Sequence, residues 1–109
     1  MTGFPPCVLI VTAEIDPAME DEWNAWYDDV HLPDALACPG VLGGQRYVSM
    51  GDASVTTLGE KSKSGARTYT TIYELSGPEA LETPEFKAMR GWYQFAVGIK
   101  ATTRVMAAR

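Results

Sequence analysis

The order of its strand-like and helix-like segments constrains the fold of this 109-residue chain more than any other feature. Residues 7–15 are a short apolar run rich in β-branched side chains, which predicts a largely buried strand. Strands are also predicted at residues 41–50, 67–75 and 98–107. One amphipathic helical segment follows the first strand and another follows the third. The predicted order is β-α-β-β-α-β, in a single domain over residues 1–109.

This order predicts an α+β fold of the ferredoxin-like type, in which a four-stranded antiparallel sheet carries its helices on one face. Alternation within residues 67–75 places Tyr69 and Tyr73 on one face of the strand and Ile72 on the other. Ile10 and Tyr73 together indicate that both faces of the sheet carry apolar side chains. Because the helices cover only one face, we expect a second copy of the chain to cover the other, giving a homodimer or a higher homo-oligomer.

Two connecting segments have their own signatures. Residues 51–66 are rich in Gly, Ser, Thr and Lys, which predicts a long hairpin loop. Loops of this length act as lids over binding sites or are simply mobile, and the sequence leaves both roles open. Residues 77–95 predict a short helical turn followed by a helix that Thr83 caps and Pro84 opens.

Charge and composition exclude several classes of function. The net charge is −5 at pH 7, and eight acidic residues precede Arg46, the first basic residue. Such a chain lacks the basic patch that attracts nucleic acid or anionic membranes. No apolar run reaches the ~18–20 residues of a membrane-spanning helix, and no signal peptide is recognisable. Cys7 and Cys38 have no metal or redox spacing, so we expect reduced thiols and a cytoplasmic protein.

The first helical segment contains the most distinctive part of the sequence. Asp16 is a favoured N-cap and Pro17 suits the first helical position, so the helix is predicted to begin there. Apolar side chains then recur every three or four residues in one stripe: Met19, Trp23, Trp26, Tyr27 and Val30. Pro33 disfavours helical geometry in the preceding residue, which predicts that the helix ends or kinks near His31.

His31, the only histidine of the chain, is the sharpest candidate for chemistry. Imidazole moves protons near neutral pH, and Tyr27 lies one helical turn before it on the same face. Trp23 and Trp26 extend this aromatic frame, which suits a pocket for a flat or apolar ligand. A histidine near a helix C-terminus can also simply bond the last free carbonyl groups and interact with the helix dipole. The residues alone leave both roles open.

Several polar side chains are candidates to assist His31. Asp28 and Asp34 lie three residues before and after it, where a carboxylate could orient the imidazole or remain an ordinary surface charge. Asp34 also suits the cap of a following short turn. Arg46 could pair with either aspartate, or bind a substrate carboxylate or phenolate. Tyr73 supplies a phenol that either donates hydrogen bonds in a pocket or packs in the core.

Motifs for cofactors and covalent chemistry are missing from the sequence. A single histidine with scattered carboxylates gives no recognisable zinc or iron site. Neither a GxGxxG sequence nor a P-loop is present, and no Ser or Cys stands in a nucleophile elbow. We therefore expect chemistry without a cofactor or a metal, by proton transfer or by an oxygen reaction that the substrate itself drives.

The segment WYDDVHLPDALACPGV, followed closely by QRY, resembles the W-Y-x-x-x-H-x-P-x-x-x-x-x-P-G segment of EthD-like proteins. The matching positions are Trp26, Tyr27, His31, Pro33, Pro39 and Gly40, with Arg46 and Tyr47 resembling the basic-aromatic pair of the next strand. EthD-like proteins belong to the dimeric α/β-barrel superfamily. The resemblance implies a homodimer whose two sheets pack face to face as a barrel, with a pocket between helix and sheet in each subunit. It also implies that His31 is the acid/base residue of that pocket.

These features predict a small cofactor-free enzyme of catabolism or secondary metabolism. Its chemistry would be of isomerase, dehydratase, cyclase or lyase type, on a small, partly apolar metabolite with aromatic or lactone-like character. His31 would shuttle the proton, and Arg46 would hold an anionic group. Tyr27 and Tyr73 would donate hydrogen bonds to an oxyanion. The residues expected to bind the substrate are Trp23, Trp26, Tyr47, Tyr73 and Asp34. Two alternatives remain: a cofactor-independent monooxygenase of a phenolic substrate, and a non-catalytic ligand-binding or accessory dimer.

Overall fold

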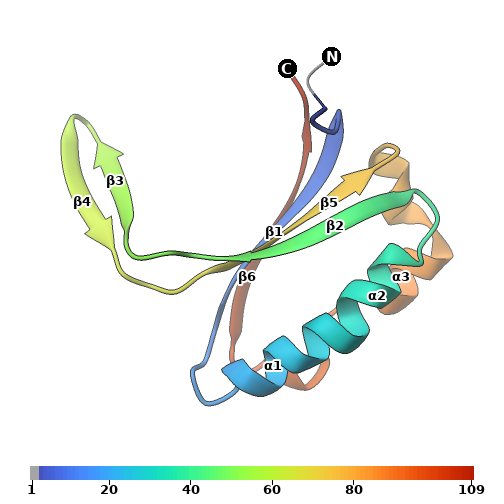
Figure 1. The fold of residues 1–109 in the computed structure, drawn as a ribbon, viewed down its shortest axis with the longest axis horizontal. Coiled ribbons are helices and arrows are strands. Elements are labelled where there is room, and N and C mark those ends of the chain that lie inside the picture. The colour runs from blue at the N-terminus through green and yellow to red at the C-terminus, as the bar shows by residue number, and fades with distance from the viewer. Residues whose placement is uncertain (1–2) are drawn as a thin grey trace.

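A computed structural model describes residues 3–109 of the chain. Four strands form one antiparallel sheet: β1 (Cys7–Ile15), β2 (Val41–Val48), β5 (Tyr69–Leu75) and β6 (Ile99–Ala107). Their order across the sheet is β2-β5-β1-β6, so that β1 and β5 are the central strands. This order is the ferredoxin-like arrangement that the sequence predicted (Figure 1).

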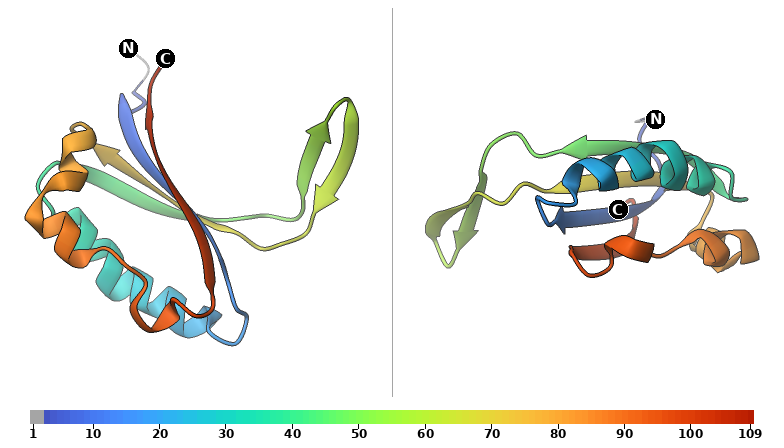
Figure 2. Two further views of the ribbon diagram at one scale, coloured as in Figure 1. Left: turned by 180° about the vertical axis from the view of Figure 1, so that it is seen from behind. Right: turned by 90° about the horizontal axis from the view of Figure 1, so that it is seen from below.

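Helices cover one face of this sheet (Figures 1 and 2). The first helical rod runs through three consecutive segments: α1 (Glu20–Trp26), the π-helical turn η1 (Tyr27–His31) and α2 (Leu32–Leu36). Three short segments follow β5: η2 (Pro78–Glu82), α3 (Pro84–Met89) and η3 (Tyr93–Phe95). Thr83 caps α3 as predicted, because its hydroxyl oxygen accepts a 3.2 Å hydrogen bond from the backbone N–H of Phe86.

The first helix begins later than predicted. The Oδ1 atom of Asp16 accepts a 2.9 Å hydrogen bond from the backbone N–H of Ala18, and the N–H of Met19 bonds to the carbonyl of Asp16. Residues 16–19 therefore form a turn, and the helix begins at Glu20. The prediction that Asp16 caps the helix was wrong because its carboxylate closes this local turn instead. Aspartate side chains often form such Asx-turns in place of a helix cap.

The segment 51–66, predicted as a long loop, contains a second, two-stranded sheet. Strand β3 (Ala53–Thr57) pairs antiparallel with β4 (Glu60–Ser64) around a two-residue turn. Every residue of both strands is exposed, and the hairpin projects on the side of the sheet away from the helices (Figure 1). We call this hairpin, residues 53–64, the arm. Its strands carry no apolar alternation because neither of their faces is buried, so the sequence pattern resembled a loop.

Strand pairing defines two different faces of the main sheet. Leu9 of β1 pairs with Tyr73 of β5, and both side chains are buried beneath the helices. Ile10 pairs with Ile72 on the opposite face, which we call the outer face and which no helix covers within residues 3–109 (Figure 2). Tyr47 of β2 also lies on the outer face and is 54% exposed. The expectation that both faces carry apolar side chains is thus confirmed.

Between sheet and helices the buried side chains form two clusters. The cluster near α1 consists of Ala13, Trp23, Tyr27 and Phe95. The cluster near α2 and α3 consists of Leu9, Val11, Ala35, Cys38, Val41, Tyr73, Leu75, Ala80 and Phe86. Trp92 packs against both clusters, which meet near His31 and Tyr27.

Candidate functional site

A cavity of about 320 Å³ lies between the helices and the sheet, where the two clusters meet. Its lining is predominantly apolar. It comes from both central strands, from β6, from the first helical rod and from the helical segments that follow β5. The lining residues are Leu9, Val11, Tyr27, His31, Ala35, Tyr73, Leu81, Phe86, Met89, Arg90, Gly91, Trp92 and Thr103. An apolar cavity with a few convergent polar groups is the usual form of a small-molecule site.

The π-helical turn η1 is the local feature that brings His31 to this cavity. The backbone N–H of Leu32 bonds to the carbonyl of Tyr27, five residues back, instead of to the residue four back. Pro33 favours this wider turn because its ring would collide with the carbonyl of Asp29 in a regular α-helix. The helix therefore widens near His31 and continues to Leu36, so the predicted kink takes the form of a π-turn.

The wider turn also aligns one buried face along the whole rod. Trp23, Tyr27, His31 and Ala35 follow one another at intervals of four residues, and all four are buried. In a regular α-helix each such interval overshoots a full turn by about 40°, which would place Ala35 about 120° away from Trp23. Because a π-turn takes more residues per turn, it cancels most of this rotation. All four side chains consequently face the sheet.

The imidazole of His31 is held in place by aromatic rings. Trp26 stacks on the imidazole, with ring centroids 4.5 Å apart and planes inclined by 20°. Tyr27 meets the ring edge-on at 4.9 Å, and Trp92 contacts it at 5.5 Å. No group within residues 3–109 makes a hydrogen bond to either ring nitrogen. The side chain is only 8% exposed and lines the cavity, so its polar atoms are available to a ligand.

Burial lowers the pKa of His31 from its ordinary 6.5 to about 4, with a smaller opposing effect of Asp34. The imidazole is therefore neutral at pH 7 and can accept a proton at one nitrogen. The alternative role as a helix cap does not fit the structure. The rod continues past His31 into α2, and the imidazole bonds no carbonyl group among the described residues.

Two phenols stand beside the imidazole in the cavity wall. The hydroxyl groups of Tyr27 and Tyr73 are 3.2 Å apart, buried and hydrogen-bonded to each other. Burial, reinforced by Tyr27, raises the pKa of Tyr73 far above its usual range, so this phenol stays protonated. Two hydrogen-bonded phenols of this kind can donate a hydrogen bond to a ligand oxygen that becomes negatively charged.

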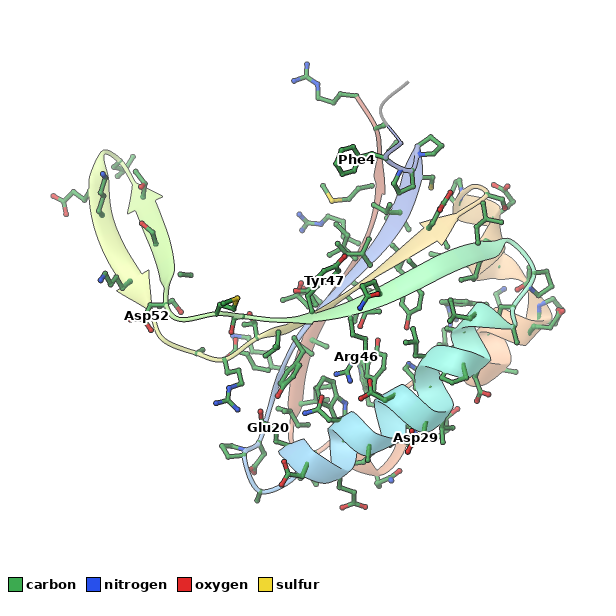
Figure 3. The ribbon with its side chains drawn as sticks, in the orientation of Figure 1. Phe4, Glu20, Asp29, Arg46, Tyr47 and Asp52 are labelled. Carbon is green, nitrogen blue, oxygen red and sulfur yellow. The ribbon has the colours of Figure 1, made fainter. Side chains whose placement is uncertain are left out.

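Arg46 lies outside the cavity lining, between the sheet and the first helical rod (Figure 3). Its guanidinium donates to Asp28 at 2.7 Å and to Asn24 at 2.8 Å, and lies 4.2 Å from the centroid of the Tyr27 ring. The predicted pairing with Asp28 is confirmed. The contacts make Arg46 a clamp between β2 and the helix, off the cavity lining.

The other expected substrate-binding residues also lie off the cavity lining. Trp23 is fully buried in the core, and Trp26 stands behind His31 as its stacking partner. Tyr47 projects from the outer face (Figure 3), and the side chain of Asp34 is exposed on the helix surface. Of the sequence-predicted site residues, the structure brings Tyr27, His31 and Tyr73 together at the cavity. The predicted site residues that do not line the cavity are Trp23, Trp26, Asp34, Arg46 and Tyr47.

Most of the other lining residues, among them Arg90, Gly91 and Thr103, had not been singled out from the sequence. Arg90, Gly91 and Trp92 follow α3 and close one side of the cavity, and Thr103 contributes from β6. Arg90 supplies the one formal charge among the lining residues at neutral pH. Gly91 has a φ of 126°, a conformation that favours glycine. A glycine directly after a helix could have predicted from the sequence that the backbone turns here.

No group of three or more His, Cys, Asp and Glu side chains is placed to hold a metal ion in the described part of the chain. Both cysteines are free thiols, and the buried thiol of Cys38 donates to the backbone carbonyl of Asp34. Within residues 3–109 no helix is both long enough and apolar enough to cross a membrane.

The fold and the cavity define a ferredoxin-like α+β protein with an internal site between its helices and its sheet. The profile of the family described as "Domain of unknown function (DUF4286)" matches residues 7–88, and the chain belongs to this family. A comparison with curated proteins finds no match.

Solved structures share the fold over most of the chain. A protein described as an antibiotic biosynthesis monooxygenase has a TM-score of 0.62 and 16% identity, covering 94% of this chain and 98% of its own. An EthD family protein from Bacillus halodurans has a TM-score of 0.58 and 16% identity, with coverages of 94% and 99%. A dimeric ferredoxin-like protein of unknown function from Thermobifida fusca has a TM-score of 0.53 and 13% identity, with coverages of 99% and 97%. The expected likeness to EthD-like proteins is therefore confirmed at the level of the fold.

Proposed function

We propose that this protein is a cofactor-free acid/base enzyme that moves a proton within a small, partly apolar substrate. One observation carries the proposal: a buried, neutral imidazole faces a cavity, and no group within residues 3–109 makes a hydrogen bond to its ring nitrogens. A merely structural histidine of this burial would normally be hydrogen-bonded within the core. The hydrogen-bonded phenols of Tyr27 and Tyr73 line the same cavity, and burial keeps the Tyr73 phenol protonated.

In the proposed reaction, a ring nitrogen of His31 accepts a proton from a carbon or oxygen acid of the substrate. The electron pair left behind moves onto a conjugated oxygen, which accepts a hydrogen bond from the Tyr27–Tyr73 pair. The low pKa of His31 makes the imidazolium a strong acid, so it returns the proton readily at a second substrate atom. This sequence gives isomerisation directly, and gives elimination or dehydration when a leaving group departs.

The cavity walls indicate the class of substrate. Trp92 and Phe86 offer aromatic surface, and Leu9 and Val11 close the sheet side with apolar groups. Arg90 is the lining residue that can neutralise a substrate carboxylate or phenolate, the role that the sequence suggested for Arg46. A flat aromatic or lactone-like metabolite with one anionic group fits these walls.

The fold likeness to an antibiotic biosynthesis monooxygenase supports a second candidate function. In that case His31 would deprotonate a phenol, and the resulting carbanion would react with oxygen in the aromatic cavity. Oxygen uptake with phenolic ligands separates the two candidates, because isomerisation and elimination consume no oxygen. A third possibility is a non-catalytic ligand-binding dimer, which predicts binding without turnover.

The test uses a panel of enolisable aryl acids and aryl lactones, with phenylpyruvate as the first member. Thermal shift identifies the binders, and NMR then follows exchange of their acidic C–H protons with deuterated solvent. We expect the wild type to accelerate exchange and His31→Gln to lose about 100-fold or more of that rate while still binding. Val30→Ala, at an exposed neighbouring position, is the matched control. Equal exchange by His31→Gln would refute the proton-transfer role, and binding without exchange would favour the non-catalytic dimer.

We also propose that the protein is a homodimer joined through the outer faces of two sheets. Ile10, Ile72 and Tyr47 give this face apolar character, and no helix covers it within residues 3–109. The dimeric ferredoxin-like protein of the same fold supports this assembly. Ile72→Asp should then convert the dimer into folded monomer, as measured by sedimentation equilibrium.

A further inference from the structure

The arm has no packing of its own that explains its presence. All ten residues of β3 and β4 are exposed, and their ladder pairs only the two strands with each other. An isolated two-stranded hairpin is at best marginally stable in water. A projecting hairpin of this kind is therefore expected to gain its stability from contact with another molecule.

The tip of the arm points to the nature of that contact. The turn consists of Leu58 and Gly59, with φ values of 51° and 79°. Two consecutive residues with positive φ between hairpin strands favour Asn-Gly, whereas leucine is unfavourable in the first of these positions. The Leu58 side chain is moreover 98% exposed. Both the backbone conformation and the solvation of an apolar side chain count against leucine here, which suggests that the side chain is buried in a complex.

The direction of the arm indicates which part of a partner it would contact. Figures 1 and 2 show the arm bending away from the helices, so that it and the ends of β1 and β6 flank the outer face. A sheet that packs on the outer face would lie about 10 Å above it, whereas a strand of five residues spans about 17 Å. The arm is thus long enough to pass the edge of a partner sheet and extend toward the helical layer behind it.

Charge favours a second copy of this chain as the partner. Lys61 and Lys63 alternate onto one face of the arm and form no ion pair with residues 3–109. The chain as a whole has a net charge of −5, and the exposed side of α1 carries Asp21 and Glu22. The basic face of an arm is therefore complementary to the acidic helical layer of another copy.

We propose that the arm clasps a second copy of this chain, with Leu58 buried against the partner and Lys61 and Lys63 directed toward its acidic helical layer. This inference rests on the proposed homodimer and adds a second, separate contact to it. In a symmetric dimer each chain gives one arm and receives one, so the contact is made twice.

The test measures the dimer dissociation constant of the full chain by sedimentation equilibrium. Leu58→Asn should favour the turn itself while removing the apolar contact, so we expect a folded protein whose dimer is weaker by about tenfold or more. Leu58→Met retains an apolar side chain and should bind nearly as tightly as the wild type. Lys61→Glu with Lys63→Glu should also weaken the dimer, and this effect should shrink at high salt.

The outcomes separate the clasp from the dimer on which it rests. A wild type that stays monomeric at all concentrations overturns both. A wild-type dimer that Ile72→Asp dissociates and Leu58→Asn leaves unchanged overturns the clasp alone. The clasp is equally overturned if Leu58→Met weakens the dimer as much as Leu58→Asn does. Weakening by Leu58→Asn without weakening by Leu58→Met supports it.

Discussion

Acidification from pH 7.5 to pH 5 should destabilise the folded protein through His31. The unfolded chain protonates this side chain with the ordinary pKa of 6.5, whereas burial lowers the pKa to about 4 in the folded state. Between these two values the unfolded state binds more protons than the folded state. The contribution of His31 to stability is therefore complete above pH 6.5 and is lost as the pH falls toward 4.

The size of the effect follows from the two pKa values. At pH 5 the unfolded imidazole is already about 1.5 pH units below its pKa of 6.5, and the folded one is still mostly neutral. Since one pKa unit corresponds to about 1.4 kcal/mol, the free energy of unfolding should fall by about 2 kcal/mol. Small domains have only about 5–15 kcal/mol of stability in total, so this loss is readily measured.

Urea denaturation of the wild type and of His31→Gln at pH 7.5 and pH 5 measures this contribution. Protein concentration is held constant, because dimerisation also affects stability. Glutamine stays neutral throughout, so the variant reports the effect of all other groups. One of these is Glu20, because its hydrogen bonds to Tyr69 and Arg67 lower its pKa. The wild type should lose about 2 kcal/mol more than the variant between the two pH values. Equal losses in both proteins, or an imidazole that titrates near pH 6.5 by NMR, would refute the reasoning.

Two further substitutions test the polar groups around the cavity. Tyr73→Phe removes one phenol of the buried pair and should cost about 1 kcal/mol of stability in urea denaturation, with a larger loss of turnover than of ligand affinity. Arg46→Leu removes the bonds to Asp28 and Asn24 and the contact with the Tyr27 ring, and should cost about 2–3 kcal/mol. Because Arg46 does not line the cavity, ligand affinity measured by calorimetry should stay within about threefold, and a complete loss would contradict this placement.

Local patterns were sufficient to predict the four strands of the main sheet and the fold. Alternation in residues 67–75 predicted that Tyr69 and Tyr73 share one face of the strand, and the structure shows that this face, with Tyr73 and Leu75 buried, lies beneath the helices. The Thr83 cap followed from residue types that suit one position in a helix. Signals of this kind depend on neighbours in the sequence, so they can be seen without the structure.

The cavity could be predicted only in part because it joins segments that are distant in the sequence. Tyr27 and His31 share one helix, and their spacing revealed them. Arg90 and Thr103 reach the cavity from a turn and from an edge strand, and no local pattern relates them to the helix. Pairing with Asp28 was one of the roles expected of Arg46, but its place off the cavity lining, where it cannot hold the substrate, depends on tertiary packing.

The π-turn can be regarded as a one-residue insertion that leaves the packing of the rest of the fold unchanged. Removal of one residue between Tyr27 and His31, together with replacement of Pro33, would restore a regular α-helix in which Trp23 and Ala35, then 11 residues apart, still share a face to within about 20°. Tyr27 and His31 would be three residues apart and about 60° out of line, so their present alignment toward the cavity would change. A relative that is one residue shorter here should therefore keep this fold and its core without this site. A single gap in an alignment would then separate proteins that have this site from proteins that only share its scaffold.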